Sequence, residues 1–237
     1  MRRAKVVFVP GFMQRGDAWA PVAERVAERY PTACLDFASH SFEPRLGELR
    51  EAAGPGDVPV GYSMGGRLAL HLAVREPDRF AALALVGASA GIDDQRERAD
   101  RAATDEELAA WMERTPIDEV VARWEALSIF ATQAPELVAA QRPGRLSHDP
   151  KLLALLLRSA GQAAVPSLWD QLERLDLPIL AVAGERDEPY LRAARRMALF
   201  APRIDPRVVF DAGHAAHLED PDAFAALLLE FLDENLG

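Results

Sequence analysis

The sequence contains a single cysteine, Cys34, in 237 residues, so no disulfide bond can form within the chain. A chain without disulfides fits a reducing compartment, and we expect Cys34 to be a small buried residue of a strand rather than a reactive thiol. No apolar run approaches the roughly 20 residues that span a bilayer. No apolar segment separates Met1-Arg2-Arg3 from the first apolar strand, so we expect no secretion signal and a cytoplasmic protein.

Basic residues are in the minority, with 27 Lys and Arg against 37 Asp and Glu and a net charge of −10. This balance disfavours nucleic acids and anionic membranes as partners. An anionic small molecule can still bind through a local cluster of arginines. The pair His214-x-x-His217 has no accompanying third ligand, so we expect no metal and no cofactor. The oligomeric state is not predicted.

The motif around which the chain is organised is Gly-x-Ser-x-Gly at residues 61–65. It follows the apolar run 58–60 and precedes a helical pattern at 63–75, so we expect a strand, a sharp turn and a helix. Ser63 at such a turn projects its hydroxyl above the sheet. Gly61 and Gly65 leave room where the strand and helix pass close together.

Apolar runs and helical patterns alternate over most of the chain, and hydrophobic residues, at 49%, suffice to fill a core. We expect strands at 5–9, 32–37, 58–60, 81–86, 178–183 and 207–210. We expect helices at 17–30, 63–75, 189–200 and 221–236. This order predicts an α/β fold with a mostly parallel sheet and helices on both faces.

A helical insertion interrupts this alternation, because no convincing strand occurs between Ile92 and Leu175. Thr104, with Glu107 three residues later, predicts a helix start with a capping box. Three prolines predict further helix starts, at residues 116, 135 and 150. We expect a core formed by residues 1–91 and 176–237 and a helical lid formed by residues 92–175. The lid interpretation rests on its position directly after the carboxyl end of a strand.

Ser63, Asp187 and His214 each follow a predicted strand. A histidine can take the serine proton, and a carboxylate behind it fixes its tautomer. The order serine, acid, histidine is typical of the α/β-hydrolase fold, so we expect these residues to form a catalytic triad. The backbone N–H groups of Phe12 and Met64 are the candidates for an oxyanion hole.

Alternatives remain for two members of this triad. Asp211 or Glu185 could take the place of Asp187, although Asp211 is too near His214 in sequence to lie on another strand end. His217 could replace His214. The other three histidines are expected to be surface or packing residues: His40, His71 and His148.

The chain resembles the α/β-hydrolase superfamily over nearly its whole length, through the elbow, the triad order and the insertion. Within it, the chain is most similar to the 2-succinyl-6-hydroxy-2,4-cyclohexadiene-1-carboxylate synthases of menaquinone biosynthesis. The matching segments are Gly-Tyr-Ser-Met-Gly-Gly-Arg at 61–67, Gly-Ile at 91–92, Trp124 followed by Phe130, Gly-Glu-Arg-Asp at 184–187, and Gly-His-Ala-Ala-His at 213–217. The resemblance implies that the triad serine acts as a base and that pyruvate is eliminated.

The resemblance also implies that Arg67, Arg101 and Arg145 hold substrate carboxylates and that Tyr62 and Trp124 line the pocket. Arginine suits this role because its planar fork binds a carboxylate through two parallel hydrogen bonds. Arg67 lies one turn beyond the serine on the same helix and can therefore face the site. For Arg101, a position on a solvated helix face is the alternative.

The chain departs from these synthases at two places. Pro10-Gly11 replaces their usual His-Gly, and Ala-Ser-His-Ser at 38–41 replaces their Gly-His-Gly segment. Two other functions therefore stay open. One is a carboxylester hydrolase or thioesterase, and the other is a non-enzymatic receptor for a small molecule on the same fold.

Overall fold

The computed structural model describes residues 3–237, and its centre is a six-stranded sheet in the order β2-β1-β3-β4-β5-β6. Every neighbouring pair of strands is parallel. The strands are β1 (Val6–Val9), β2 (Thr32–Cys34), β3 (Val58–Tyr62), β4 (Leu83–Val86), β5 (Ile179–Gly184) and β6 (Ile204–Val209). Because the strands are parallel, their carboxyl ends meet at one edge of the sheet, as the sequence predicts.

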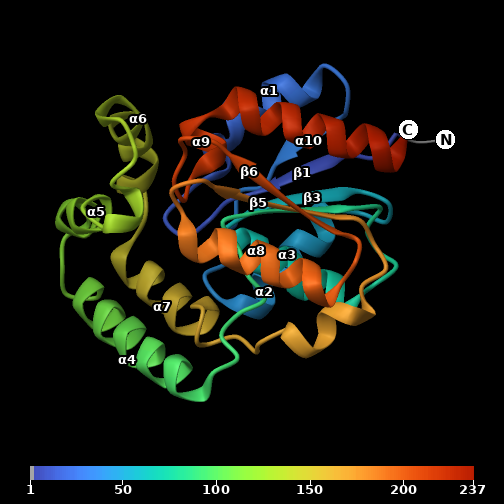
Figure 1. Ribbon diagram of the computed structural model, residues 1–237. Helices are drawn as coiled ribbons and strands as arrows, with labels where there is room; N and C mark the ends of the chain where they lie inside the picture. Colours follow the sequence, from blue (N-terminus) through green and yellow to red (C-terminus); the bar gives the residue numbers. More distant parts are fainter. Residues whose placement is uncertain (1–2) are drawn as a thin grey trace.

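Helices cover both faces of the sheet (Figure 1). Alternate side chains of β1 point to opposite faces, so Val7 and Val9 join one apolar cluster and Val6 and Phe8 join the other. On one face lie α1 (Ala20–Ala27), α9 (Ala216–Glu219) and α10 (Pro221–Leu236), and on the other lie α2 (Phe42–Ala52), α3 (Met64–Arg75) and α8 (Glu188–Phe200). A short 3₁₀ helix, η1 (Gly16–Trp19), precedes α1.

The segment between β4 and β5 is helical throughout its regular elements and lies to one side of the sheet (Figure 1). We call it the inserted helices. They are α4 (Gln95–Met112), α5 (Ile117–Glu125), η2 (Ser128–Phe130), α6 (Pro135–Leu146), α7 (Pro150–Ala160) and η3 (Trp169–Arg174). Leu153 and Leu156 of α7 are buried in the same apolar cluster as Ala109 and Met112 of α4. Within residues 3–237, no helix is both long and apolar enough to cross a bilayer.

The helix starts predicted from proline are confirmed, whereas the start predicted at Thr104 is wrong. Two helices begin at Pro135 and Pro150, and Pro116 is the N-cap of α5. Asp94 caps α4 instead, because its side chain accepts a hydrogen bond of 2.7 Å from the N–H of Glu97. Thr104 lies in the middle of α4.

Cys34 lies in a strand as predicted, but the expectation that it is buried is wrong. The thiol belongs to β2, which is the strand at one edge of the sheet, and the residue is exposed. An edge strand has a neighbour on one side only, and the sequence does not show which strand takes the edge.

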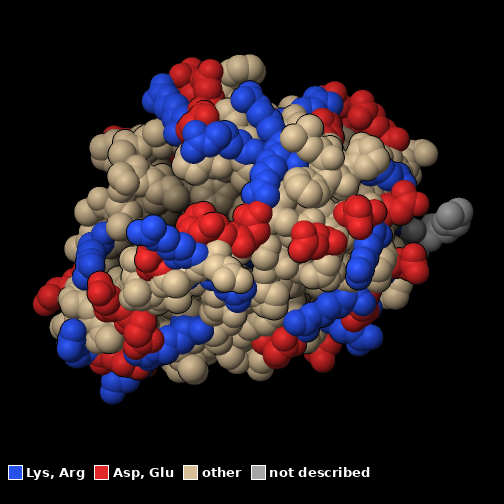
Figure 2. Space-filling view, turned by 60° about the horizontal axis from the view of Figure 1, so that its bottom comes forward, with Lys and Arg blue, Asp and Glu red and all other residues tan. Residues whose placement is uncertain are grey.

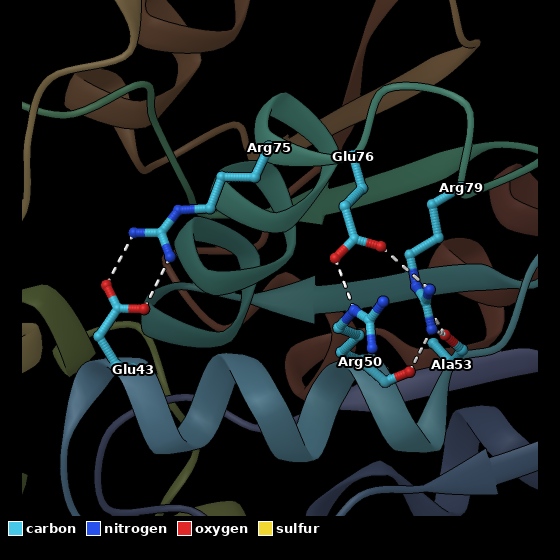
Figure 3. A network of polar contacts seen from close by, with 6 residues as sticks. All are labelled: Glu43, Arg50, Ala53, Arg75, Glu76 and Arg79. Carbon is cyan, nitrogen blue, oxygen red and sulfur yellow. Dashed lines mark hydrogen bonds and ion pairs between the residues drawn. The ribbon is translucent and has the colours of Figure 1, made fainter.

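Arginines join α2 to α3 and to the turn that follows it (Figure 3). Arg75 forms two hydrogen bonds with the carboxylate of Glu43, of 2.7 and 2.8 Å. Glu76 binds both Arg50 and Arg79. Arg79 also donates to the backbone carbonyl oxygens of the last residues of α2. These contacts cover the end of α2 beside the helix that carries the elbow.

Candidate active site

Ser63 lies at the junction of β3 and α3 in a strained backbone conformation, with φ at 50° and ψ at −110°. Its N–H donates to the carbonyl oxygen of Val86 on the neighbouring strand at 2.8 Å. A Cβ on Gly61 would lie 2.5 Å from the backbone nitrogen of Gly66, and one on Gly65 would lie 2.4 Å from the carbonyl oxygen of Val9. Glycine is therefore required at both positions for the strand and helix to approach this closely.

The side chains of Ser63, His214 and Asp187 meet at the carboxyl edge of the sheet. Nε2 of His214 lies 3.3 Å from Oγ of Ser63, and its Nδ1 lies 2.7 Å from Oδ2 of Asp187. Asp187 directly precedes α8 after β5, and His214 follows β6. When Nδ1 donates to the carboxylate, Nε2 can accept the serine proton. The arrangement can therefore generate a serine base or nucleophile.

The alternative triad members lie elsewhere. Asp211 is exposed and pairs with Arg186, while the carboxylate of Glu185 accepts the N–H of Asp211. His217 is fully buried, with its ring centroid 4.1 Å from that of Trp19. Burial holds the pKa of His217 well below its usual value, so this imidazole stays neutral.

A cavity of about 310 Å³ opens in front of Ser63 and His214. All seven residues that the sequence predicts for the oxyanion hole and for substrate binding line it: Phe12, Tyr62, Met64, Arg67, Arg101, Trp124 and Arg145. Residues from both the sheet edge and the inserted helices thus face one space.

A larger groove of about 910 Å³ adjoins the cavity, and Arg101, Ile129, Gln162 and Tyr190 line both spaces. The face shown in Figure 2 is hollowed, with acidic and basic side chains together round the hollow. The shared wall means that a change in any of these four side chains alters both spaces.

The two candidate oxyanion donors, Phe12 and Met64, belong to different segments of the chain that both line the cavity. Met64 is the first residue of α3, so its N–H has no acceptor in a preceding turn. Phe12 belongs to the loop after β1. The side chain of Gln14 fixes this loop by accepting a 3.2 Å hydrogen bond from the N–H of Gly11. Both N–H groups are therefore placed by backbone geometry rather than by mobile side chains.

Arg67 is partly buried, and its Nη1 is inaccessible and makes no hydrogen bond to any residue from 3 to 237. Burial, helped by the positive charge of Arg101 and opposed by Tyr190 and Asp105, lowers the pKa of Arg67 to about 10. Even so, the guanidinium stays charged at neutral pH. A largely buried cation that forms no ion pair within residues 3–237 is costly, and an anion entering the cavity would reduce that cost.

The other two arginines of the cavity are each held by an acid of the inserted helices. Arg101 donates to Asp105 at 2.8 Å and to the side-chain oxygen of Gln162 at 3.0 Å. Arg145 donates to Glu125 at 3.1 Å. Neither acid was predicted from the sequence. The spacing of four residues between Arg101 and Asp105 is a signal that could have revealed the first.

Two further residues of the cavity were missed. The ring of Tyr190 lies 4.6 Å from that of His214, and its position one turn after Asp187 could have suggested this. Gln133 lies between η2 and α6, and no motif in the sequence marks it. In the part of the chain that the structure describes, no group of three or more His, Cys, Asp or Glu residues could hold a metal ion.

Comparison with known proteins gives a consistent result. The model of the alpha/beta hydrolase family matches residues 6–227. A provisional 2-succinyl-6-hydroxy-2,4-cyclohexadiene-1-carboxylate synthase of Bacillus subtilis is 35% identical over 176 residues, which is 73% of this chain and 64% of that protein. The protein PHYLLO of Arabidopsis thaliana is 28% identical over 95% of this chain, which spans only 15% of that protein. The synthase of the same name in Serratia proteamaculans is 27% identical over 97% of this chain and 93% of its own length.

Among solved structures, MenH from S. aureus superposes with a TM-score of 0.88 at 27% identity, over 99% of this chain and 95% of its own. A thermophilic esterase from Thermogutta terrifontis superposes with a TM-score of 0.82 at 22% identity, over 99% of this chain and 91% of its own. The second likeness concerns the fold alone.

Proposed function

Because the chain belongs to the alpha/beta hydrolase family, we propose that it eliminates pyruvate from a small enolpyruvyl polycarboxylate in the manner of a 2-succinyl-6-hydroxy-2,4-cyclohexadiene-1-carboxylate synthase. The product of that reaction, by its name, carries a hydroxyl and a carboxylate on adjacent ring carbons. We assign the reaction to the cytoplasm, which the exposed Cys34 fits because its thiol needs reducing conditions.

The observation that carries this proposal is Arg67, which lies in the same cavity as Ser63 and His214. Its Nη1 is buried and makes no hydrogen bond to any described residue. An ester substrate without a free carboxylate brings no negative charge to the guanidinium of Arg67, whereas a carboxylated substrate does. Arg101 and Arg145 supply two further guanidinium groups, each oriented by its own acid.

In the proposed mechanism, His214 takes the proton of Ser63, and the serine oxygen takes a proton from a carbon next to a carbonyl of the substrate. The electron pair of that C–H bond forms a new C=C bond as the C–O bond to the enolpyruvyl group breaks. The enolate of pyruvate leaves with the C–O electron pair. It is then protonated by His214, which holds the proton that it took from Ser63. The N–H groups of Phe12 and Met64 stabilise the negative charge that develops on the substrate carbonyl oxygen.

We further propose that residues 1–91 and 176–237 act as the catalytic core and residues 92–175 as a lid. The inserted helices supply Arg101, Trp124 and Arg145 to the cavity, so the binding groups and the triad come from different segments of the chain. Such a lid excludes water from the enolate and favours elimination over hydrolysis.

The direct test is pyruvate release from the enolpyruvyl substrate, followed with lactate dehydrogenase and NADH. We expect turnover by the wild type, a loss of about 10³-fold or more in Ser63→Ala, and a loss of about 10- to 100-fold in Arg67→Met, because charge-assisted hydrogen bonds are removed. Arg192→Met, which alters an exposed arginine paired with Glu188, is the matched control and should keep wild-type turnover. No pyruvate above background with folded wild type would reject the proposal.

A carboxylester hydrolase or thioesterase is the second candidate, favoured by the apolar side of the cavity. Leu108, Phe130 and Leu157 line it together with Trp124. This alternative predicts a burst with short p-nitrophenyl esters, abolished in Ser63→Ala. A non-enzymatic receptor on this fold would leave Ser63 unlabelled by a fluorophosphonate.

A further inference from the structure

Gln133 is a buried side chain in the wall of the catalytic cavity, and its amide has no hydrogen-bond partner among the described residues. The residue is 9% exposed and lies between η2 and α6. Neither Oε1 nor Nε2 makes a hydrogen bond to any other residue in the described chain. Its backbone N–H donates to the carbonyl oxygen of Phe130 at 3.0 Å, so the main chain beneath the side chain is held in place.

An enclosed amide with both ends unused is costly, and such groups in native proteins usually have a functional reason. Gln162 shows the contrast within the same cavity. Its Oε1 accepts from Arg101 at 3.0 Å, and its Nε2 donates to Oγ of Ser89 at 3.3 Å. The two glutamines therefore differ in that one supports a neighbouring arginine and the other is available to a ligand.

The chemistry of an amide defines the group that Gln133 can bind. The three arginines of the cavity only donate, and a carboxylate only accepts, so carboxylates satisfy the arginines but cannot use Oε1 of Gln133. A hydroxyl donates one hydrogen bond and accepts others, and thus matches both ends of the amide. Because Gln133 and the three arginines line the same cavity, one small molecule can present a hydroxyl to the amide and a carboxylate to a guanidinium.

We propose that Gln133 is a specificity-determining residue that binds a hydroxyl group of a hydroxy acid while the cavity arginines hold its carboxylate. The inference rests on the proposed function, because it assumes that the cavity accepts a carboxylated substrate. Beyond that function, Gln133 makes the cavity bind the hydroxylated substrate more tightly than an analogue that lacks the hydroxyl.

The test uses two small ligands that differ by one hydroxyl, 2-hydroxycyclohexane-1-carboxylate (cis and trans isomers) and cyclohexane-1-carboxylate. Binding is measured by calorimetry on the full chain. We expect the better hydroxy isomer to bind the wild type about tenfold more tightly than the deoxy acid. In Gln133→Met, which keeps the length of the side chain, this ratio should fall to about one while the affinity for the deoxy acid is retained.

Gln162→Met is the matched control. It removes a hydrogen bond from Arg101, so it should weaken both acids by a similar factor and leave their ratio unchanged. The melting temperature of Gln133→Met should equal or exceed that of the wild type, because an unsatisfied amide is replaced by an apolar group. A purely structural role for Gln133 would instead lower the melting temperature and leave the ratio as it is.

The inference is overturned by a wild-type ratio near one, by a ratio that persists in Gln133→Met, or by failure of the wild type to bind either acid. A tenfold ratio that depends on Gln133, in a protein that releases no pyruvate, would support the inference and reject only the proposed reaction.

Discussion

His71 is a buried residue of α3 that the triad does not use. Its ring meets that of Phe42 edge to face, with the centroids 5.0 Å apart. Burial lowers its pKa to about 4, and the positive charges of Arg67 and Arg75 act in the same direction, against the opposing effect of Glu43. The folded chain therefore keeps this imidazole neutral at pH values where the unfolded chain protonates it.

This difference in protonation between the folded and unfolded chain makes the stability depend on pH. Between pH 6.5 and pH 4 the unfolded state binds more protons at this site, so stability falls as the pH falls through this window. Between pH 7 and pH 5, we expect His71 to account for a loss of about 2 kcal/mol in the free energy of unfolding. In urea unfolding, the free energy of unfolding of His71→Leu should fall between pH 7 and pH 5 by about 2 kcal/mol less than that of the wild type. An equal fall in both proteins would contradict this role of His71.

At the scale of single residues, the sequence predicted the site residues that lie just after the carboxyl ends of strands. Ser63, Asp187 and His214 could be named because each follows a buried apolar run, and the carboxyl ends of parallel strands share one edge. Gln133 could not be named. It comes from a connecting segment of the inserted helices, and its importance depends on partners that it lacks in three dimensions, for which no periodicity gives a signal.

At the scale of elements, the end of α2 depends on Arg79. The guanidinium donates to the backbone oxygens of Arg50 and Ala53, which have no helical partner of their own, and its side chain is only 11% exposed (Figure 3). Glu43, by contrast, forms an exposed pair with Arg75. A partly buried arginine on free carbonyls stabilises more than an exposed ion pair.

We therefore expect Arg79→Ala to lower the free energy of unfolding by about 1–3 kcal/mol and Glu43→Ala by less than about 1 kcal/mol. Chemical denaturation of both variants in low and high salt provides the measurement. Salt should reduce the small effect of Glu43→Ala and leave most of the effect of Arg79→Ala. Equal losses in the two variants would argue against a capping role.

Whether a segment is a helix or a strand was easier to predict than the residue at which it begins. The prolines at residues 116, 135 and 150 mark helix starts because proline fits the first turn of a helix. Thr104 and Glu107 carry the pattern of a capping box, yet α4 already begins at Gln95. Asp94, directly before Gln95, can also cap a helix through its side-chain oxygen. Local patterns alone do not decide between two such caps, and packing of α4 on α7 favours the longer helix.

At the scale of the whole molecule, the inserted helices touch the loop that carries His214. A Cβ on Gly213 would lie 2.1 Å from Oγ1 of Thr132 and 3.1 Å from its Cβ, so glycine is what allows this approach. The ring of Phe130, from the same segment, lies 6.4 Å from that of His214. The position of the catalytic imidazole is thus coupled to the position of the inserted helices.

We expect Gly213→Ala to push these segments apart and lower turnover by about tenfold or more, since small displacements of catalytic groups are costly. Thr132→Ala alone should change little, because its hydroxyl makes no hydrogen bond within residues 3–237. The double variant should recover part of the lost turnover, because it removes the closest contact. Additive losses in this double-mutant cycle would show that the two segments are independent.

The spacing of the triad along the chain has a consequence for biosynthesis. Ser63 precedes its histidine by 151 residues, and Asp187 precedes it by only 27. A ribosome that has completed the elbow must still translate the inserted helices and the strands β4, β5 and β6 before the imidazole exists. The nascent polypeptide consequently carries an inert hydroxyl for most of its elongation, and competence arises only as the last strand joins the margin of the sheet.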